Sequence, residues 1–315
     1  MPKELTHFLM AEKTAESVRE TKLGKAAAAN RNALLFGAIF PDILYYTSKP
    51  LPDGIASIPH RMHGKEGGLN FIRMQADLLT EQPDNDVRAA LLLGMICHVS
   101  LDETMHPMVG YLTEGSGNKT AKGRTLATQR HRALESLMDM VLCPERIGDG
   151  DYRLKTIGGD HGNRFLEDLP MAALGEAAAT TREEMSNAHR KCWRSYDRLQ
   201  RLCAFRNLSN AAYAAGYLLP DKPREFITLL YVPCFSRQES ILTGNIEFKH
   251  PATGQNFTET LSGLMDKAVA KTAAVAQEIE AALHGGPFPA ELPNPGNGLL
   301  GELKFFAPEP APRLF

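Results

Sequence analysis

The chain has 315 residues and a formal net charge of −2 at pH 7, because 35 Lys and Arg stand against 37 Asp and Glu. A charge this close to zero disfavours general electrostatic capture of nucleic acid or of an anionic membrane. Hydrophobic residues make up 43%, enough for a large core, and the five cysteines include no C-x-x-C pair, which excludes a thiolate zinc motif and a disulfide framework.

The N-terminal residues carry charges within the first dozen positions and contain no signal-like apolar run. No stretch of the sequence approaches the roughly 18 uninterrupted apolar residues of a membrane span. We therefore expect a cytoplasmic protein without a transmembrane segment.

Helical periodicity dominates the chain, so we expect an all-α fold. In the first half, the pattern predicts helices over about 6–18, 25–40, 64–80, 86–105 and 125–142, a Pro-rich loop over 47–59 and a flexible loop over 114–123. In the second half, 145–168 is expected to be irregular, helices are predicted over 170–204, 207–218 and 257–284, and 226–235 is compatible with a strand or a helix. We expect one domain over 1–315, with a metal-binding half (1–145), a helical second half (146–284) and a Pro-rich tail (285–315) that wraps over the surface as coil.

The apolar helix predicted over 86–105 carries a stripe of ligand-type side chains. His98, Asp102 and His106 follow one another at four-residue steps, which places them on one face with Cβ atoms about 5–6 Å apart. His131 and Glu135 repeat this spacing on the next predicted helix. A buried carboxylate without compensation costs several kcal/mol, so the stripe requires protons, partners or a metal.

Imidazole and carboxylate ligands without thiolate suit Zn, Mn, Fe or Ni. One such histidine alone would more often be an ordinary hydrogen-bonded side chain, but three pairs on two apolar helices favour a metal. A His and carboxylate salt-bridge network without metal is the alternative. Pro107 is expected to kink or end the helix and to turn His106 away from its axis.

Five segments of the first half also occur in an informative order. They are THFLMAEKTA, FGAIFPDILYY, the His-Gly pair at His63, LLLGMICHVSLDETMHP and RHRALESLMD. In this order and context the chain resembles the zinc-dependent phospholipase C family over about residues 4–142. That family shares its all-α fold with single-strand-specific zinc nucleases, so the resemblance implies a multi-helix bundle with a multinuclear metal cleft.

The resemblance implies three metal positions. The first would be held by Asp42, His63, His98 and Asp102, the second by His106, His131 and Glu135, and the third by His7 together with Asp102 as a bridging carboxylate. His60 lies three residues before His63 and is the alternative ligand, although the Gly after His63 fits the family better.

Two departures from the family bear on the number of metals. In the secreted members an N-terminal tryptophan completes the third position, whereas the only tryptophan here is Trp193. The step from Asp102 to His106 is also shorter than in those enzymes. We therefore expect two Zn²⁺ ions, or three if His7 finds another partner, and other divalent transition metals fit the same ligands.

These ligands predict a metal-dependent phosphodiesterase that hydrolyses a phosphate ester with a metal-activated water. Asp42 is the candidate catalytic residue, as an acceptor of the proton of the attacking water. The expected substrate is a small phosphodiester or a phospholipid head group. A nuclease or nucleotidase is the runner-up, but 7% aromatic residues and a near-neutral charge do not favour stacking platforms and a basic rim. A metal-binding scaffold without turnover is the third interpretation.

The remaining candidates are expected to have structural roles. Glu103 and Asp139 neighbour the ligands in the sequence but are predicted to face elsewhere on their helices, so either a solvated position or a role in supporting the ligands is expected for them. The aromatic residues around Asp42 are expected to belong to the core rather than to a substrate wall. Surface positions are predicted for the other histidines, namely His161, His189, His250 and His284.

Overall fold

The computed structural model describes residues 3–47, 49–64, 68–113, 121–204, 206–216, 218, 220, 225–232 and 238–295. Within these residues the fold is helical, apart from one antiparallel pair of strands, β1 (Ile246–Lys249) and β2 (Asn256–Glu259). The predicted all-α class is confirmed. In the part of the chain that is described, no helix is both long and apolar enough to cross a membrane.

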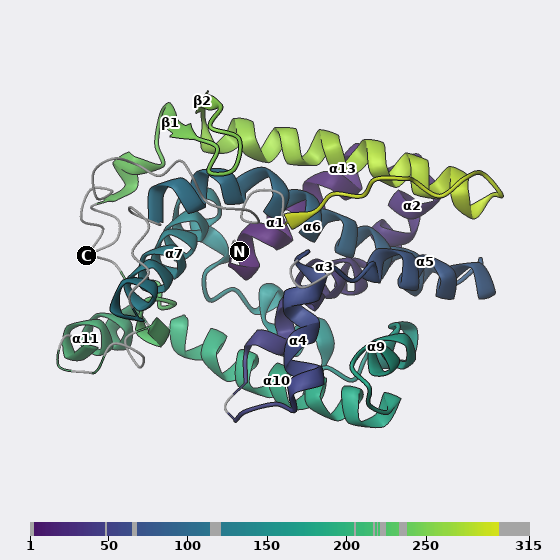
Figure 1. Cartoon of the computed structure of the whole chain (residues 1–315), viewed down its shortest axis with the longest axis horizontal. Helices are drawn as coiled ribbons and strands as arrows, with labels where there is room; N and C mark the ends of the chain where they lie inside the picture. The colour runs from purple at the N-terminus through teal and green to yellow at the C-terminus, as the bar shows by residue number, and fades with distance from the viewer. Residues whose placement is uncertain are drawn as a thin grey trace.

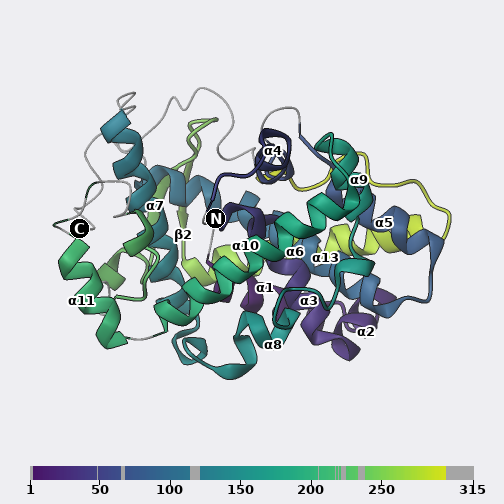
Figure 2. The same ribbon diagram turned by 90° about the horizontal axis from the view of Figure 1, so that it is seen from below.

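One long helix forms the centre of the molecule. Helix α6 (Asp86–Thr113) is buried along most of its length, and Figure 1 shows it running through the middle of the bundle. The helices packed on it are α1 (Glu4–Ser17), α2 (Lys22–Ala29), α3 (Arg31–Ile39), α5 (Phe71–Glu81), α7 (Ala121–Leu142) and α13 (Leu261–Leu283). Figure 2 shows α10 (Arg182–Cys203) running across the molecule from the end near α11 (Arg206–Gly216) towards α9 (Met171–Ala177). The ligand stripe predicted from the sequence therefore lies in the core.

Helices α3 and α6 approach each other so closely that only glycine fits at two positions. A Cβ atom on Gly94 would lie 2.2 Å from the carbonyl oxygen of Leu34, and one on Gly37 would lie 2.2 Å from that of Leu91. Both distances are far inside van der Waals contact, so the two backbones touch there. This contact sets His98, one turn after Gly94, against the end of α3.

Helix α4 (Asp53–Met62) overturns the prediction of a Pro-rich loop over 47–59. The helix begins at Asp53 and includes Pro59. Ile55, Ile58 and Met62 are buried on one face, and this burial outweighs the loss of one hydrogen bond at the proline. The 3₁₀ helix η1 (Phe40–Tyr45) lies between α3 and α4 in the chain and carries Asp42.

Pro107 was expected to kink or to end the helix, and it does not end α6. The helix continues to Thr113 because Met108 and Val109 beyond the proline are fully buried. The predicted helix over 170–204 is in fact two helices, α9 and α10, because Thr181 and Glu184 form a capping box that starts α10. Other predicted helices differ at their ends: 25–40 divides into α2 and α3 at Asn30, and 64–80 becomes helical only at Phe71.

The segment 145–168 contains only short elements, as expected: η2 (Pro144–Arg146), η3 (Gly150–Tyr152), α8 (Leu154–Gly158) and η4 (Leu166–Asp168). Residues 225–232 form a helical turn and a bend rather than a strand, and 233–235 lie outside the described residues. The β1–β2 hairpin was not predicted, and it moves the start of α13 from the expected 257 to Leu261.

The described part of the tail, 285–295, is almost entirely coil and runs back from the end of α13 towards α4 (Figure 1). Pro293 and Pro295 are buried there. The predicted loop over 114–123 lies outside the described residues except for 121–123, which belong to α7.

Candidate metal centre

The carboxylate of Asp102 lies at the centre of four imidazoles. Its Oδ2 atom is 3.5 Å from Nε2 of His63 and 3.5 Å from Nε2 of His98. Its Oδ1 atom is 3.6 Å from Nε2 of His7 and 3.6 Å from Nε2 of His106. The two oxygens thus face two different pairs of imidazoles, which is the arrangement of a carboxylate that can bridge two cations.

His63 and His98 direct their Nε2 atoms at each other, 3.0 Å apart. Nδ1 of His63 is 2.6 Å from the carbonyl oxygen of Pro59, and Nδ1 of His98 is 2.8 Å from that of Ala38. A carbonyl only accepts, so the hydrogen bonds assign the proton of each neutral ring to Nδ1 and leave a lone pair on Nε2. A metal-binding histidine is typically fixed in this way, through its other ring nitrogen.

Asp42, from η1, completes this group. Its Oδ1 atom is 3.3 Å from Nε2 of His63 and 3.8 Å from Nε2 of His98. Two lone pairs and two carboxylates that converge in a buried space repel one another unless a cation or a proton lies between them. The residues therefore fit a divalent metal such as zinc, which takes nitrogen and oxygen ligands.

The histidines of this group differ in basicity. Burial, and then the proximity of His7 and His63, lowers the pKa of His98 well below its ordinary value. For His63 burial also acts to lower the pKa, but the hydrogen bond and the charge of Asp42 outweigh it, so the pKa is raised. His98 is thus the less basic of the two imidazoles, and His63 is the more basic one.

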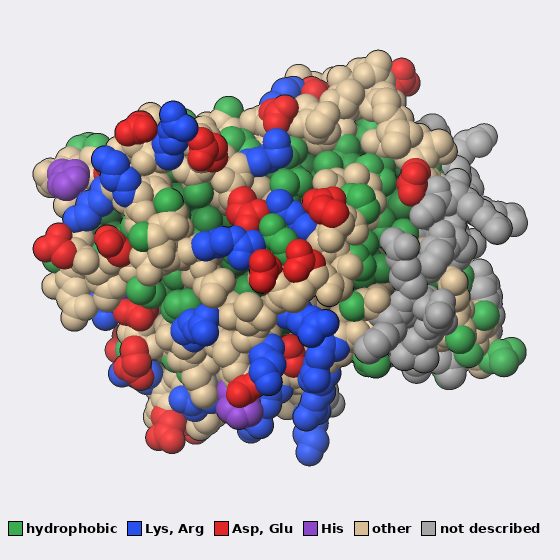
Figure 3. Space-filling model, turned by 180° about the vertical axis from the view of Figure 1, so that it is seen from behind, with side chains coloured by type: hydrophobic (Ala, Val, Ile, Leu, Met, Phe, Trp, Pro, Cys, Tyr) green, Lys and Arg blue, Asp and Glu red, His purple; other side chains and the backbone are tan. Residues whose placement is uncertain are grey.

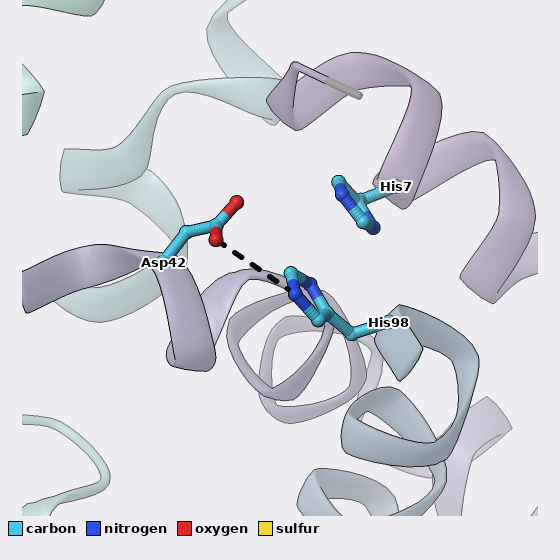
Figure 4. A group of neighbouring side chains, drawn as sticks. All are labelled: His7, Asp42 and His98. Atoms are coloured by element: carbon cyan, nitrogen blue, oxygen red, sulfur yellow. Dashed lines mark ion pairs between the residues drawn. The ribbon is translucent and has the colours of Figure 1, made fainter. Parts of the chain in front are cut away.

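His7 enters the cluster from the first helix, α1. Its ring stacks on that of His98 with 4.3 Å between centroids and 10° between planes. Figure 4 shows His7, Asp42 and His98 arranged around one space from three different elements, and their ligand atoms lie within 4.8 Å of one another.

The second predicted ligand set is more open. His131 and Glu135 pair on α7 with 2.8 Å between Nε2 and Oε1, and the His131 side chain keeps 20% of its exposure. The ring centroid of His131 lies 6.2 Å from that of His106. Nδ1 of His106 lies 3.4 Å from the Pro295 carbonyl oxygen, and burial lowers the pKa of this histidine well below its ordinary value. The tail therefore contributes a backbone acceptor that turns Nε2 of His106 towards Asp102.

Of the alternative ligands, the structure brings His63 and not His60 into the cluster. His60 is exposed, and its Nδ1 atom lies 3.4 Å from the hydroxyl of Tyr45. Trp193 does not replace the tryptophan of the secreted enzymes. Its ring stacks on Phe36, and its indole N–H donates to the carbonyl of Gly159.

His189, which was predicted to lie on the surface, and Asp139, which was predicted to face away from the ligands, are both buried. His189 is 1% exposed among Phe36, Phe40 and Trp193, and burial lowers its pKa to about 3. Asp139 is fully buried and bonds to α1. His189 was expected on the exposed face of α10, but it lies on the buried face, and most charged residues of the helix lie on the opposite face.

The other predicted structural residues lie outside the cluster, namely His161 (exposed), His250 (bonded to the 252–253 backbone), His284, Glu103 (paired with Lys271), and Phe40 and Tyr46 in aromatic contacts.

The groups that orient the ligands could not be recognised from the sequence. The carbonyl oxygens of Ala38 and Pro59 leave no mark on the residue types, and their roles depend on contacts between separate helices. One usable signal was Gly94, an isolated glycine inside an apolar helix and one turn before His98. Such a glycine indicates close packing at that level of the helix.

One of the comparisons with known proteins found a match. A family model described as zinc dependent phospholipase C matches residues 6–180, more than half of the chain. This range includes all eight predicted ligands, from His7 to Glu135. No curated protein and no solved structure matches the chain.

Proposed function

The chain belongs to the zinc-dependent phospholipase C family, and from this premise we propose that it is a metal-dependent phosphodiesterase acting on a small phosphodiester or a phospholipid head group. The family implies a hydrolase. One observation carries the proposal: the Nε2 atoms of His63 and His98 face each other at 3.0 Å beside two carboxylates, while both Nδ1 atoms donate to carbonyls. Such a set is built to bind a cation.

We assign the first metal position to Asp42, His63, His98 and Asp102, and the second to His106, His131 and Glu135. The Oδ1 atom of Asp102, which faces His7 and His106, supports its role as the bridge between positions. Zinc bound there supplies a Lewis acid for a phosphoryl oxygen and lowers the pKa of a coordinated water. His7 adds a third position if another group joins it.

Asp42 is the residue we propose as proton acceptor. Asp102 is fully buried and enclosed by four imidazoles, so its carboxylate is not accessible to an attacking water. Asp42 contacts the same space from a short 3₁₀ helix at the edge of the cluster. A carboxylate there can orient the attacking water and take its proton.

The nuclease alternative makes a different substrate prediction. A nuclease needs a basic track for the phosphate backbone. Among the described residues, the face shown in Figure 3 offers no such track, because acidic side chains lie among its Lys and Arg. We expect the zinc-loaded protein to hydrolyse bis(4-nitrophenyl) phosphate or 4-nitrophenyl-phosphocholine faster than it cleaves a single-stranded oligonucleotide. Release of nitrophenol measures the rate on the nitrophenyl substrates, and gel analysis measures the rate on the oligonucleotide. Faster oligonucleotide cleavage would support the nuclease, and no turnover on any substrate would support the scaffold.

The metal content tests the ligand assignment separately from activity. We expect about two tightly held zinc equivalents per chain, as in two-metal hydrolases. His131→Ala should remove one of them because it deletes a ligand of the second position. His161→Ala is the control, because that histidine is exposed and remote from the cluster. Elemental analysis after gel filtration gives the three contents, and equal values would contradict the assignment.

A further inference from the structure

The first turn of α1 is capped by a side chain from another helix. Lys3 occupies the N-cap position but makes no side-chain cap bond. Asp139 of α7 takes that role: its Oδ1 atom accepts from the backbone N–H of Thr6 at 2.8 Å and from the Thr6 hydroxyl at 2.6 Å. Its Oδ2 atom accepts from the N–H of Leu5 at 3.3 Å and from the Tyr231 hydroxyl at 2.7 Å.

The two ends of this connection lie next to predicted metal ligands. Thr6 immediately precedes His7, and Asp139 lies one helical turn after Glu135. One carboxylate thus ties the helix that carries His7 to the helix that carries His131 and Glu135. It does so at full burial, where the hydrogen bonds are not weakened by water.

Asp139 is an acidic residue in a position that disfavours a negative charge. Burial first, and the neighbouring Glu4 second, raise the pKa of Asp139 to about 6. Four donors and the positive end of the α1 dipole offset this cost. An apolar residue would fill the space without that cost. It could not accept hydrogen bonds from α1, however, and so could not fix the position of α1 relative to α7.

We propose that Asp139 is a positioning residue that sets the placement of His7 relative to the α7 ligands and thereby the affinity for zinc. This inference rests on the proposed metal centre and adds to it a residue that does not contact the metal. Loss of the connection leaves every ligand in the chain but lets α1 shift against α7.

The chain contains a matched control. Glu280 on α13 caps α2 in the same manner, accepting from the N–H of Lys22 at 2.9 Å and from that of Leu23 at 3.1 Å. Helix α2 carries none of the predicted ligands. Removal of either cap destabilises a helix start, but only removal of Asp139 should reach the metal.

The experiment compares zinc affinity in the full-length wild type, Asp139→Ala and Glu280→Ala, by competition with a chromophoric chelator. We expect Asp139→Ala to weaken at least one zinc equivalent about tenfold or more, the size typical of residues that orient ligands. Glu280→Ala should lower the melting temperature of the metal-free protein but leave zinc affinity unchanged. Asp139→Asn, which keeps one acceptor oxygen, should recover part of the lost zinc affinity. Thr6→Val removes only the hydrogen bond from the Thr6 hydroxyl and should therefore weaken zinc binding less than Asp139→Ala does.

Each outcome decides the matter. Equal zinc affinities in the Asp139→Ala and Glu280→Ala proteins would overturn the inference while the metal centre stands. A wild type that binds no zinc would overturn the proposed function and the inference with it. If Asp139→Ala does not fold, the Asp139→Asn and Thr6→Val proteins provide the same comparison, and wild-type affinity in both would also overturn it.

Discussion

Asp42→Asn is expected to abolish phosphodiester hydrolysis, with a loss in kcat of about 10³-fold or more, within the range typical of general acid–base catalysis. The amide keeps the shape of the side chain but has neither the charge nor the basicity of the carboxylate. Both proposed tasks of Asp42, as a ligand and as a proton acceptor, need the carboxylate. The loss should therefore persist when zinc is supplied in excess.

The measurement is the rate of nitrophenol release at saturating substrate, with the zinc content of each sample determined in parallel. Asp197→Asn is the control, because Asp197 is also largely buried but pairs with Arg201 on α10. It should retain wild-type kcat. Full activity of Asp42→Asn at wild-type zinc content would remove Asp42 from the mechanism.

The parts of the site that follow from local spacing could be predicted from the sequence. His98, Asp102 and His106 share a stripe because α6 is a regular helix, and His131 and Glu135 share one on α7 for the same reason. Four-residue spacing fixes neighbouring side chains wherever the helix itself is certain. The resemblance to the family then placed the ligands from other elements.

The parts that depend on contacts between distant elements could not be predicted. Helix α4 forms because Ile55, Ile58 and Met62 are buried against the core, although its proline and glycine, and the prolines just before it, indicate a loop. The Nδ1 partners of His63 and His98 are backbone carbonyls, which every residue type possesses. Asp139 was expected to face away from the ligands, and only its partners on α1 give it a role near them.

Removal of the metal is expected to lower the thermal stability of the protein strongly. The cluster holds Asp42 and Asp102 at 4% and 0% exposure beside His63 and His98. Without a cation, these carboxylates and lone pairs repel one another in a space where solvent cannot screen them. Binding to the folded state alone stabilises it by about 4 kcal/mol when the free metal exceeds its Kd a thousandfold. In a chain of 315 residues, whose unfolding entropy is larger than that of a 250-residue domain, this corresponds to a fall of roughly 6 °C in Tm.

The test is a calorimetric or fluorescence melt of the zinc-loaded protein before and after treatment with a chelator, followed by addition of zinc. The Tm should fall on chelation and recover with zinc. His63→Ala, which lacks one imidazole of the first position, should start at a lower Tm and lose less on chelation. A chelator that removes the metal and leaves the wild-type Tm unchanged would contradict the view that these buried carboxylates depend on a cation, because some other compensation would then hold them in place.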